Sequence, residues 1–268
     1  MITKIVDDFA AVSASKLKIL ENSFVRYFLL SVLAGVYVGF GIILIFSIGA
    51  PLGALGSGFL KLLMGVSFGI ALTLVVFGNA ELFTGNNMVM AIGAFDGKVT
   101  WKSTLWLWLI CYAGNFAGSI LLALVFVASG LSNNSTSAFV IKAAEIKIMA
   151  PFWELFFRGI LCNMLICLAI WMSQRTKEDI AKIFLIFWCL FAFIASGFEH
   201  CVANMTLLCV AYFSNLHHPI VSISGIADNL IPVSLGNIVG GAFIIGLIYW
   251  YIGRGKTKTL VRSKLDGI

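Results

Sequence analysis

The sequence predicts an all-α integral membrane protein with six transmembrane helices, of which the second and the fifth are broken. Of its 268 residues, 60% are hydrophobic and only 11% are charged, and a soluble domain could not bury that much apolar surface. A hydrocarbon core about 30 Å thick needs roughly 20 helical residues to cross it. Six stretches are long enough, at about residues 24–48, 59–94, 101–130, 151–173, 181–214 and 233–253.

Two short polar stretches interrupt these apolar segments. FGNAELFTGNN, residues 77–87, lies in the second span, and SGFEHCVAN, residues 196–204, lies in the fifth. The bilayer core offers no water to backbone N–H and C=O groups, so such a stretch survives only where protein encloses it or where it lines a wet path. We therefore expect a helix break at membrane depth in each of these two spans.

The two halves of the chain repeat one pattern around these breaks. Each break contains E-x-x-x-x-N, and each is followed by G-N-x-x-G, whose asparagine comes 34 residues after the glutamate in the first half and 38 in the second. The residues are Glu81, Asn86, Gly114, Asn115 and Gly118 in the first half, and Glu199, Asn204, Gly236, Asn237 and Gly240 in the second. Paired breaks at corresponding positions of two halves indicate a transport site near the membrane midplane.

The distribution of lysine and arginine predicts the orientation. An even number of spans places both ends of the chain on one side, and the segments on that side hold fourteen Lys and Arg residues. The opposite loops hold only Lys142 and Lys147, with Lys61 and Arg158 left out because they lie near span ends. This positive-inside bias predicts cytoplasmic termini. It also accounts for the net charge of +6 through contact with the lipid bilayer, so no nucleic acid partner is expected.

The hydropathy and charge patterns divide the chain into three segments. Residues 1–22 have helical hydrophobic spacing and are expected to form an amphipathic cytoplasmic helix, either on the membrane face or at the inner mouth of the pore. Residues 23–253 form the six-span channel domain, and residues 254–268 form a basic cytoplasmic tail.

Three titratable residues, Glu81, Glu199 and His200, are predicted to lie near the middle of the membrane, where such groups usually mark pathways or relays. Because the glutamates recur at matching positions, we expect each to accept hydrogen bonds from backbone N–H groups freed by its break. His200 has no counterpart, since Leu82 occupies the matching position. We expect this imidazole to face the pore, because its charge can change near neutral pH.

Other side chains near the breaks are also candidates for the pore. Thr84 supplies a hydroxyl, and the half-helix that begins near it presents a positive dipole end, which favours an anion. Asn163 in the fourth span either holds helices together or lines the pore. The apolar residues that flank the breaks either narrow the path or simply pack between helices, and they are Leu82, Phe83, Phe193 and Phe198.

The motifs GNAELFTGN and GFEHCVANM, together with the two G-N-x-x-G pairs, resemble the formate/nitrite transporter family of bacterial anion channels. The likeness extends from about residue 20 to residue 253. It implies an aquaporin-like protomer of inverted three-helix repeats in the bacterial cytoplasmic (inner) membrane. It also implies a homopentamer with one pore per subunit, for monovalent anions such as formate, nitrite, hydrosulfide or lactate.

The resemblance assigns individual residues to the pore. It implies that Thr84 and His200 form a central pair between two apolar constrictions. The outer constriction matches Leu82 and Phe193, and the inner constriction matches Phe68 and Leu72. The residues that it places along the pore or in support of it are Lys147 in the vestibule, the amides Asn163 and Asn204, and Glu199.

The leading hypothesis is a channel for a small monovalent anion of a weak acid, with hydrosulfide favoured and formate or nitrite left open. Lys147 and the helix dipoles would draw the anion inward. Between the constrictions, His200 and Thr84 would hydrogen-bond the anion, and the imidazole could lend it a proton.

Two other classes of protein share part of this pattern. An aquaporin-type channel for water or neutral solutes is the alternative, although neither break contains the proline of an N-P-A box. A membrane enzyme that uses Glu199 and His200 as acid and base is the third hypothesis. The sequence argues against it, because it contains no H-E-x-x-H or G-x-S-x-G motif. His217 and His218 supply too few ligands for a metal site, and no cofactor is expected.

Overall fold

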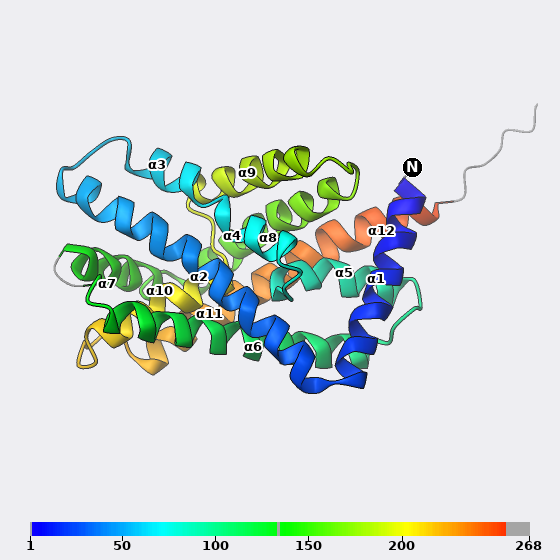
Figure 1. The fold of residues 1–268 in the computed structure, drawn as a ribbon, viewed down its shortest axis with the longest axis horizontal. Coiled ribbons are helices and arrows are strands. Elements are labelled where there is room, and N and C mark those ends of the chain that lie inside the picture. The colour runs from blue at the N-terminus through cyan, green and yellow to red at the C-terminus, as the bar shows by residue number, and fades with distance from the viewer. Residues whose placement is uncertain (1, 133–134, 256–268) are drawn as a thin grey trace, which may run out of the picture.

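The computed structural model describes residues 2–132 and 135–255, and within these ranges the chain forms helices joined by turns, without a strand. In the same part of the chain, six helical spans are long and apolar enough to cross a membrane. They run along the long axis of the molecule, with the connecting turns at its two ends (Figure 1). The predicted all-helical, six-span fold is therefore confirmed.

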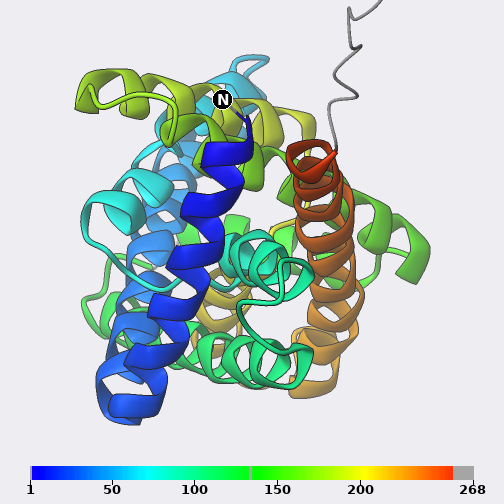
Figure 2. The same cartoon turned by 90° about the vertical axis from the view of Figure 1, so that its right-hand side faces the viewer.

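The first half of the chain begins with helix α1 (Ile2–Asn22), which lies across one end of the molecule (Figure 2). The first span is α2 (Phe24–Ala54), and the second consists of α3 (Leu60–Ser67) and α4 (Ile70–Phe77) before the break and α5 (Phe83–Phe95) after it. The third span is α6 (Trp101–Ala128).

The second half begins with helix α7 (Ser135–Ile148), which lies at the opposite end from α1 (Figure 1). The fourth span is α8 (Phe152–Ser173), and the fifth consists of α9 (Asp179–Ser196) and α10 (Cys201–Ser214). The sixth consists of α11 (Ile223–Ile238), the π-helix η1 (Val239–Gly246) and α12 (Leu247–Arg254). Both halves thus contain an end helix, a span, a broken span and a span. Because the end helices lie at opposite ends, the two repeats are inverted.

The structure differs from the sequence reading at several boundaries. The breaks are shorter than expected, at residues 78–82 and 197–200, because the polar residues that follow them belong to helices α5 and α10. The sixth span begins at Ile223 rather than at about residue 233. Proline usually disrupts a helix. The helix instead continues through Pro232, and Ser222 caps its start by accepting a hydrogen bond from the Gly225 N–H at 3.2 Å.

The glycines of the two G-N-x-x-G motifs allow spans to pack closely. A Cβ atom on Gly118 would lie 2.0 Å from the carbonyl oxygen of Val32, and one on Gly240 would lie 2.4 Å from that of Ile160. Gly118 thus brings α6 against α2, and Gly240 brings η1 against α8. Small residues commonly permit such close approach between membrane helices. The repeated motif is therefore a packing device in both halves.

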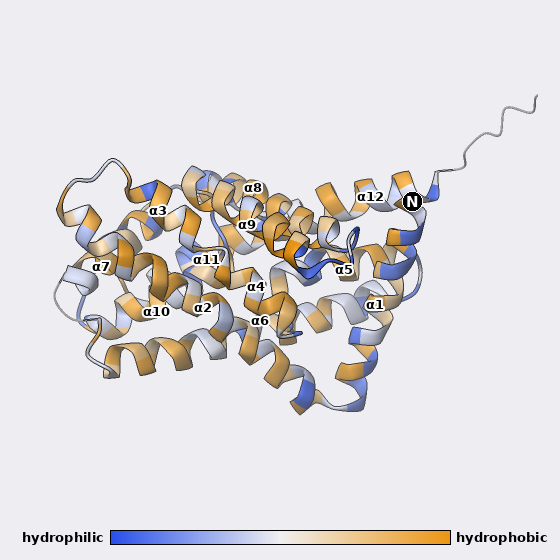
Figure 3. Ribbon diagram, turned by 45° about the horizontal axis from the view of Figure 1, so that its top comes forward, coloured by the Kyte–Doolittle hydropathy of each residue, from blue (hydrophilic) through white to orange (hydrophobic). Residues whose placement is uncertain are grey.

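The residues along the spans are mostly hydrophobic, while hydrophilic residues gather at the end that carries α1 and at the turns (Figure 3). The α1 helix is anchored at that end by its buried apolar side chains, among them Val6 and Phe9. Arg254, the last residue of α12, bonds to Asp96 at 2.6 Å and to Asp7 of α1 at 2.8 Å. Most of the predicted basic tail, residues 256–268, lies outside the described residues.

Candidate functional site

The two broken spans meet at a contact between Thr84 and His200. Thr84 lies in the first turn of α5, and His200 is the residue that caps the start of α10. The Thr84 Oγ1 atom lies 2.9 Å from His200 Nε2, although the residues are 116 positions apart in the chain. Both side chains are buried. The structure therefore brings together the pair that the family resemblance placed at the centre.

The hydrogen bonds of His200 determine where the neutral ring carries its proton. Its Nδ1 atom accepts a hydrogen bond from the Ala203 N–H at 3.1 Å. The neutral ring therefore holds its hydrogen on Nε2 and donates it to Thr84 Oγ1. The hydroxyl hydrogen of Thr84 is then available for a third group. Protonation of Nδ1 would place N–H against N–H and would break the bond to Ala203.

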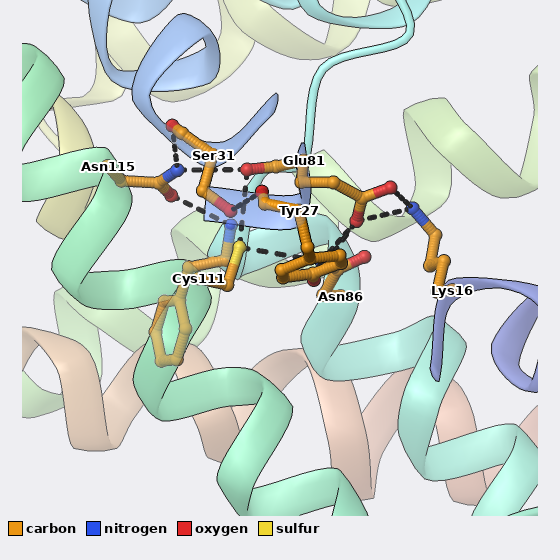
Figure 4. Close-up of polar contacts among 8 residues, drawn as sticks. Lys16, Tyr27, Ser31, Glu81, Asn86, Cys111 and Asn115 are labelled. Carbon is orange, nitrogen blue, oxygen red and sulfur yellow. Dashed lines mark hydrogen bonds and ion pairs between the residues drawn. The ribbon is translucent and has the colours of Figure 1, made fainter. Parts of the chain in front are cut away.

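The side chain of Asn115 in α6 stabilises the backbone of the first break (Figure 4). Its side-chain oxygen accepts a hydrogen bond from the Phe83 N–H at 2.9 Å, which satisfies a donor at the start of α5. Its side-chain nitrogen donates to the carbonyl oxygens of Glu81, at 2.9 Å, and Ser31, at 2.8 Å. One carboxamide thus pairs two backbone groups that the break leaves without helical partners, the Phe83 N–H and the Glu81 carbonyl, as a segment at membrane depth requires, and it also ties the break to α2.

Asn237 of α11 does the same at the second break. Its oxygen accepts from the Cys201 N–H at 2.9 Å, and its nitrogen donates to the carbonyls of Glu199, at 2.9 Å, and Gly159, at 2.7 Å. The expectation that Glu81 and Glu199 would bind these backbone N–H groups is therefore wrong. A carboxamide suits the position better, because it can accept from an N–H and donate to carbonyls at once.

The carboxylate of Glu81 binds side chains instead (Figure 4). Lys16 of α1 contacts both of its oxygens, at 2.6 and 2.7 Å, and Asn86 donates to it at 2.8 Å. The hydroxyl of Tyr27 also donates to this carboxylate, at 3.2 Å. The glutamate is buried, so the lysine compensates a charge that would be costly alone.

Glu199 repeats this arrangement at the opposite end of the pore region. Lys147 of α7 contacts both carboxylate oxygens at 2.7 Å, and Asn204 donates to one of them at 2.6 Å. Lys147 is therefore paired, so Glu199 offsets the positive charge that was expected to draw anions inward. The E-x-x-x-x-N motif is also explained, because in both halves the asparagine bonds to the glutamate five positions earlier.

Sequence reasoning missed Lys16. The available signal was the repeat itself, since each half begins with an end helix that contributes one lysine to the glutamate of its own break. The distance in sequence hid this relation, because Lys16 and Glu81 are 65 positions apart and Lys147 and Glu199 are 52 apart.

The four proposed constriction residues are all buried, but they pair differently from the expectation. The rings of Phe68 and Phe193 meet edge to face with centroids 5.5 Å apart, and Phe193 also stacks on His200 at 6.0 Å. Leu72 and Leu82 instead line a cavity of about 500 Å³ at the end that carries α1. These contacts group Phe68 with Phe193, and Leu72 with Leu82, whereas the family resemblance paired Leu82 with Phe193 and Phe68 with Leu72, and the assignment of the constrictions stays a prediction. Residues one helical turn apart lie at different depths along a span.

Asn163 lies behind Thr84. Its side-chain nitrogen lies 3.2 Å from the carbonyl oxygen of Thr84, 3.1 Å from Asn87 Oδ1 and 2.6 Å from the carbonyl oxygen of Asn237. These contacts join α5, α8 and α11. Of the two roles left open for this amide, they favour holding the helices together over lining the pore.

Comparison with known proteins agrees with this architecture. The family model described as "Formate/nitrite transporter" matches residues 3–251. The chain is 41% identical over 256 residues to the nitrite transporter NirC of Escherichia coli, covering 94% of this chain and 92% of that protein. It is 32% identical over 247 residues to the formate channel FocA of E. coli, covering 85% of this chain and 86% of that protein.

Solved structures show the same likeness. One, titled "FNT family ion channel", superimposes with a TM-score of 0.88 and 41% identity, covering 93% of this chain and 99% of the other. A "Pentameric formate channel with formate bound" superimposes with a TM-score of 0.72 and 28% identity, covering 85% and 96%. A family model that matches nearly the whole sequence, relatives that cover most of it and a shared fold establish that this chain belongs to the formate/nitrite transporter family.

Proposed function

We propose that this chain is a membrane channel for small monovalent anions of weak acids, with the buried contact between Thr84 and His200 as its central site. The observation that carries the proposal is the 2.9 Å contact itself, made where two half-helices begin at membrane depth. Buried polar groups in a membrane span usually belong to a transport pathway. Similar proteins named for nitrite and formate transport support the substrate class.

The contacts around the pair suggest how an anion would be accommodated. Thr84 accepts the His200 hydrogen bond and keeps its own hydroxyl hydrogen for the passing anion. The positive dipole ends of α5 and α10 add to the stabilisation of negative charge there. On one side the path would pass Phe68 and Phe193, and on the other Leu72 and Leu82. Such apolar constrictions favour ions that shed their water easily or cross in neutral form.

The two Lys–Glu pairs set the electrostatics on either side of the centre. Each places one positive and one negative charge in direct contact, at Lys16 with Glu81 and at Lys147 with Glu199. Neither carboxylate is therefore a bare negative charge that would repel an entering anion. We propose that these residues, together with Asn163 and Asn204, support the pore by fixing the breaks.

Proton transfer at the centre has a structural condition. As placed, His200 donates a hydrogen bond through Nε2, while Nδ1 is engaged by Ala203. To give a proton to an anion and remain a neutral ring, it must first take up a second proton on Nδ1 and release Ala203. We propose that hydrogen bonding is the primary role of the ring and that proton transfer requires this rearrangement.

The finer substrate assignment is also a proposal. Nitrite and formate are supported by the names of similar proteins, whereas hydrosulfide remains a prediction from overall likeness to one branch of the family. We further propose a homopentamer in the bacterial cytoplasmic membrane, with both termini cytoplasmic. A similar solved protein is a pentamer, and the charge distribution favours this orientation.

The test is anion flux into proteoliposomes containing His200→Leu or the matched variant His217→Leu, whose histidine is exposed. Nitrite, formate and hydrosulfide are compared at two pH values. Loss of the hydrogen bond that orients the Thr84 hydroxyl toward the anion is expected to reduce flux roughly tenfold or more, or to alter its pH dependence, only in His200→Leu. An unchanged flux profile in that variant would contradict the proposed central role.

A further inference from the structure

We propose that the chain binds a phosphate-bearing anion in a second cavity, which we call the basic cavity, at the end of the molecule that carries α1. The basic cavity has a volume of about 660 Å³ and lies between the start of α1, the end of α8 and the turn that leads into α9. Its charged lining residues are Lys4, Asp8, Arg175, Lys177 and Lys182. Neither Thr84 nor His200 belongs to its lining.

The charge of the lining indicates the ligand. Four cationic side chains and one carboxylate line a single cavity. Lys182 is paired with Asp179 at 2.8 Å, but among the described residues neither Lys4 nor Lys177 forms an ion pair. Clustered lysines and an arginine at a membrane surface favour phosphate groups, which offer several acceptor oxygens and more than one negative charge.

The surroundings of the basic cavity favour a phosphate that belongs to a lipid as well as one that is free. On α9, Ile180, Phe184 and Trp188 recur at every fourth position, and their side chains are 73%, 60% and 57% exposed. The stripe starts at the same level of α9 as the cavity-lining Lys182 but on another face, because residues two positions apart do not face each other on a helix. The stripe thus marks the depth at which lipid chains would meet this end of the molecule. The shared chemistry of the two sources is the phosphate group.

The basic cavity adjoins the cavity of about 500 Å³ that Leu72 and Leu82 line, but it is distinct from the proposed polar centre of the pore. Val76, Ser173 and Gln174 line both cavities, so a bound phosphate would lie against the wall of the cavity that Leu72 and Leu82 line. Neither Lys–Glu pair is part of the basic cavity. Phosphate binding can therefore be measured without measuring transport, and its result does not depend on which anions the pore conducts.

The experiment measures thermal unfolding of the delipidated full-length protein in an uncharged detergent. One arm adds sodium phosphate against sodium chloride at equal ionic strength, and a second adds phosphatidylglycerol against diacylglycerol, which has similar chains but no phosphate. A ligand that binds only the folded state raises the unfolding temperature in a concentration-dependent way. The variant Lys4→Gln/Lys177→Gln is compared with Lys18→Gln/Lys102→Gln, which removes equal charge from exposed residues outside both cavities.

We expect Lys4→Gln/Lys177→Gln to raise the half-saturating ligand concentration roughly tenfold, because two contributing charges are lost. The control and a Lys4→Arg/Lys177→Arg variant should behave as wild type. Stabilisation by both additives, or by sodium phosphate alone, identifies free phosphate as a sufficient ligand, and stabilisation by phosphatidylglycerol alone identifies a lipid headgroup. The inference is overturned if neither additive stabilises the wild type more than its comparison, or if the two glutamine variants respond alike.

Discussion

Replacing Asn237 by alanine should destabilise the second break far more than the loss of one ordinary hydrogen bond would. The side chain of Asn237 is the partner of three backbone groups, the Cys201 N–H and the carbonyls of Glu199 and Gly159, at 2.9, 2.9 and 2.7 Å. A buried polar group left without a partner costs about 1–3 kcal/mol. Gly159 lies within α8, where its carbonyl also accepts a helical hydrogen bond, so the Cys201 N–H and the Glu199 carbonyl are the groups left without a partner. Two such groups predict a loss of about 2–6 kcal/mol in the free energy of unfolding.

The matched control is Thr206→Val, which removes a single buried hydrogen bond, from Thr206 Oγ1 to Ser119 Oγ at 3.0 Å. We expect it to cost about 1 kcal/mol. Both variants are unfolded reversibly in mixed micelles, and their free energies are compared with wild type. If Asn237→Ala costs no more than Thr206→Val, the reasoning that a single carboxamide maintains the break is refuted.

Three further predictions concern other parts of the fold. Lys16→Met should cost about 3–5 kcal/mol in unfolding free energy by stranding the buried Glu81, and adding Glu81→Gln should recover most of it. Gly118→Ala places a Cβ 2.0 Å from a backbone oxygen of the first span and should lower folded yield, whereas Gly58→Ala, with nothing within 4 Å, should not. Partial burial raises the pKa of Asp96, but hydrogen bonds from Arg254 and Trp250 outweigh it and hold the pKa below its ordinary value of 3.8. The stability that ionised Asp96 contributes is therefore present above about pH 4 and is lost as pH falls through the folded-state pKa. When the free energy of unfolding is measured against pH, Asp96→Asn should remove this loss of stability at low pH.

Much of the architecture follows from the sequence because hydropathy and helix breaks are local properties. The six spans, the two polar interruptions and the repeated motifs can all be found by reading along the chain. The sequence also pointed to Thr84 and His200, since His200 departs from the repeat at a position where the first half has Leu82. The start of the sixth span at Ile223 was not predicted. Pro232 is locally unfavourable in a helix, yet the surrounding helices accommodate it.

The partners of these residues were decided only by the tertiary structure. Nothing in the local pattern indicates that Lys16 from the first helix neutralises Glu81, or that Asn115, rather than a glutamate, pairs the backbone of the first break. The same holds for the contact of Phe68 with Phe193. Hydrophobicity determines which segments enter the membrane. Which polar and aromatic groups then meet depends on how the helices pack, because each buried group must find its partner in a different segment.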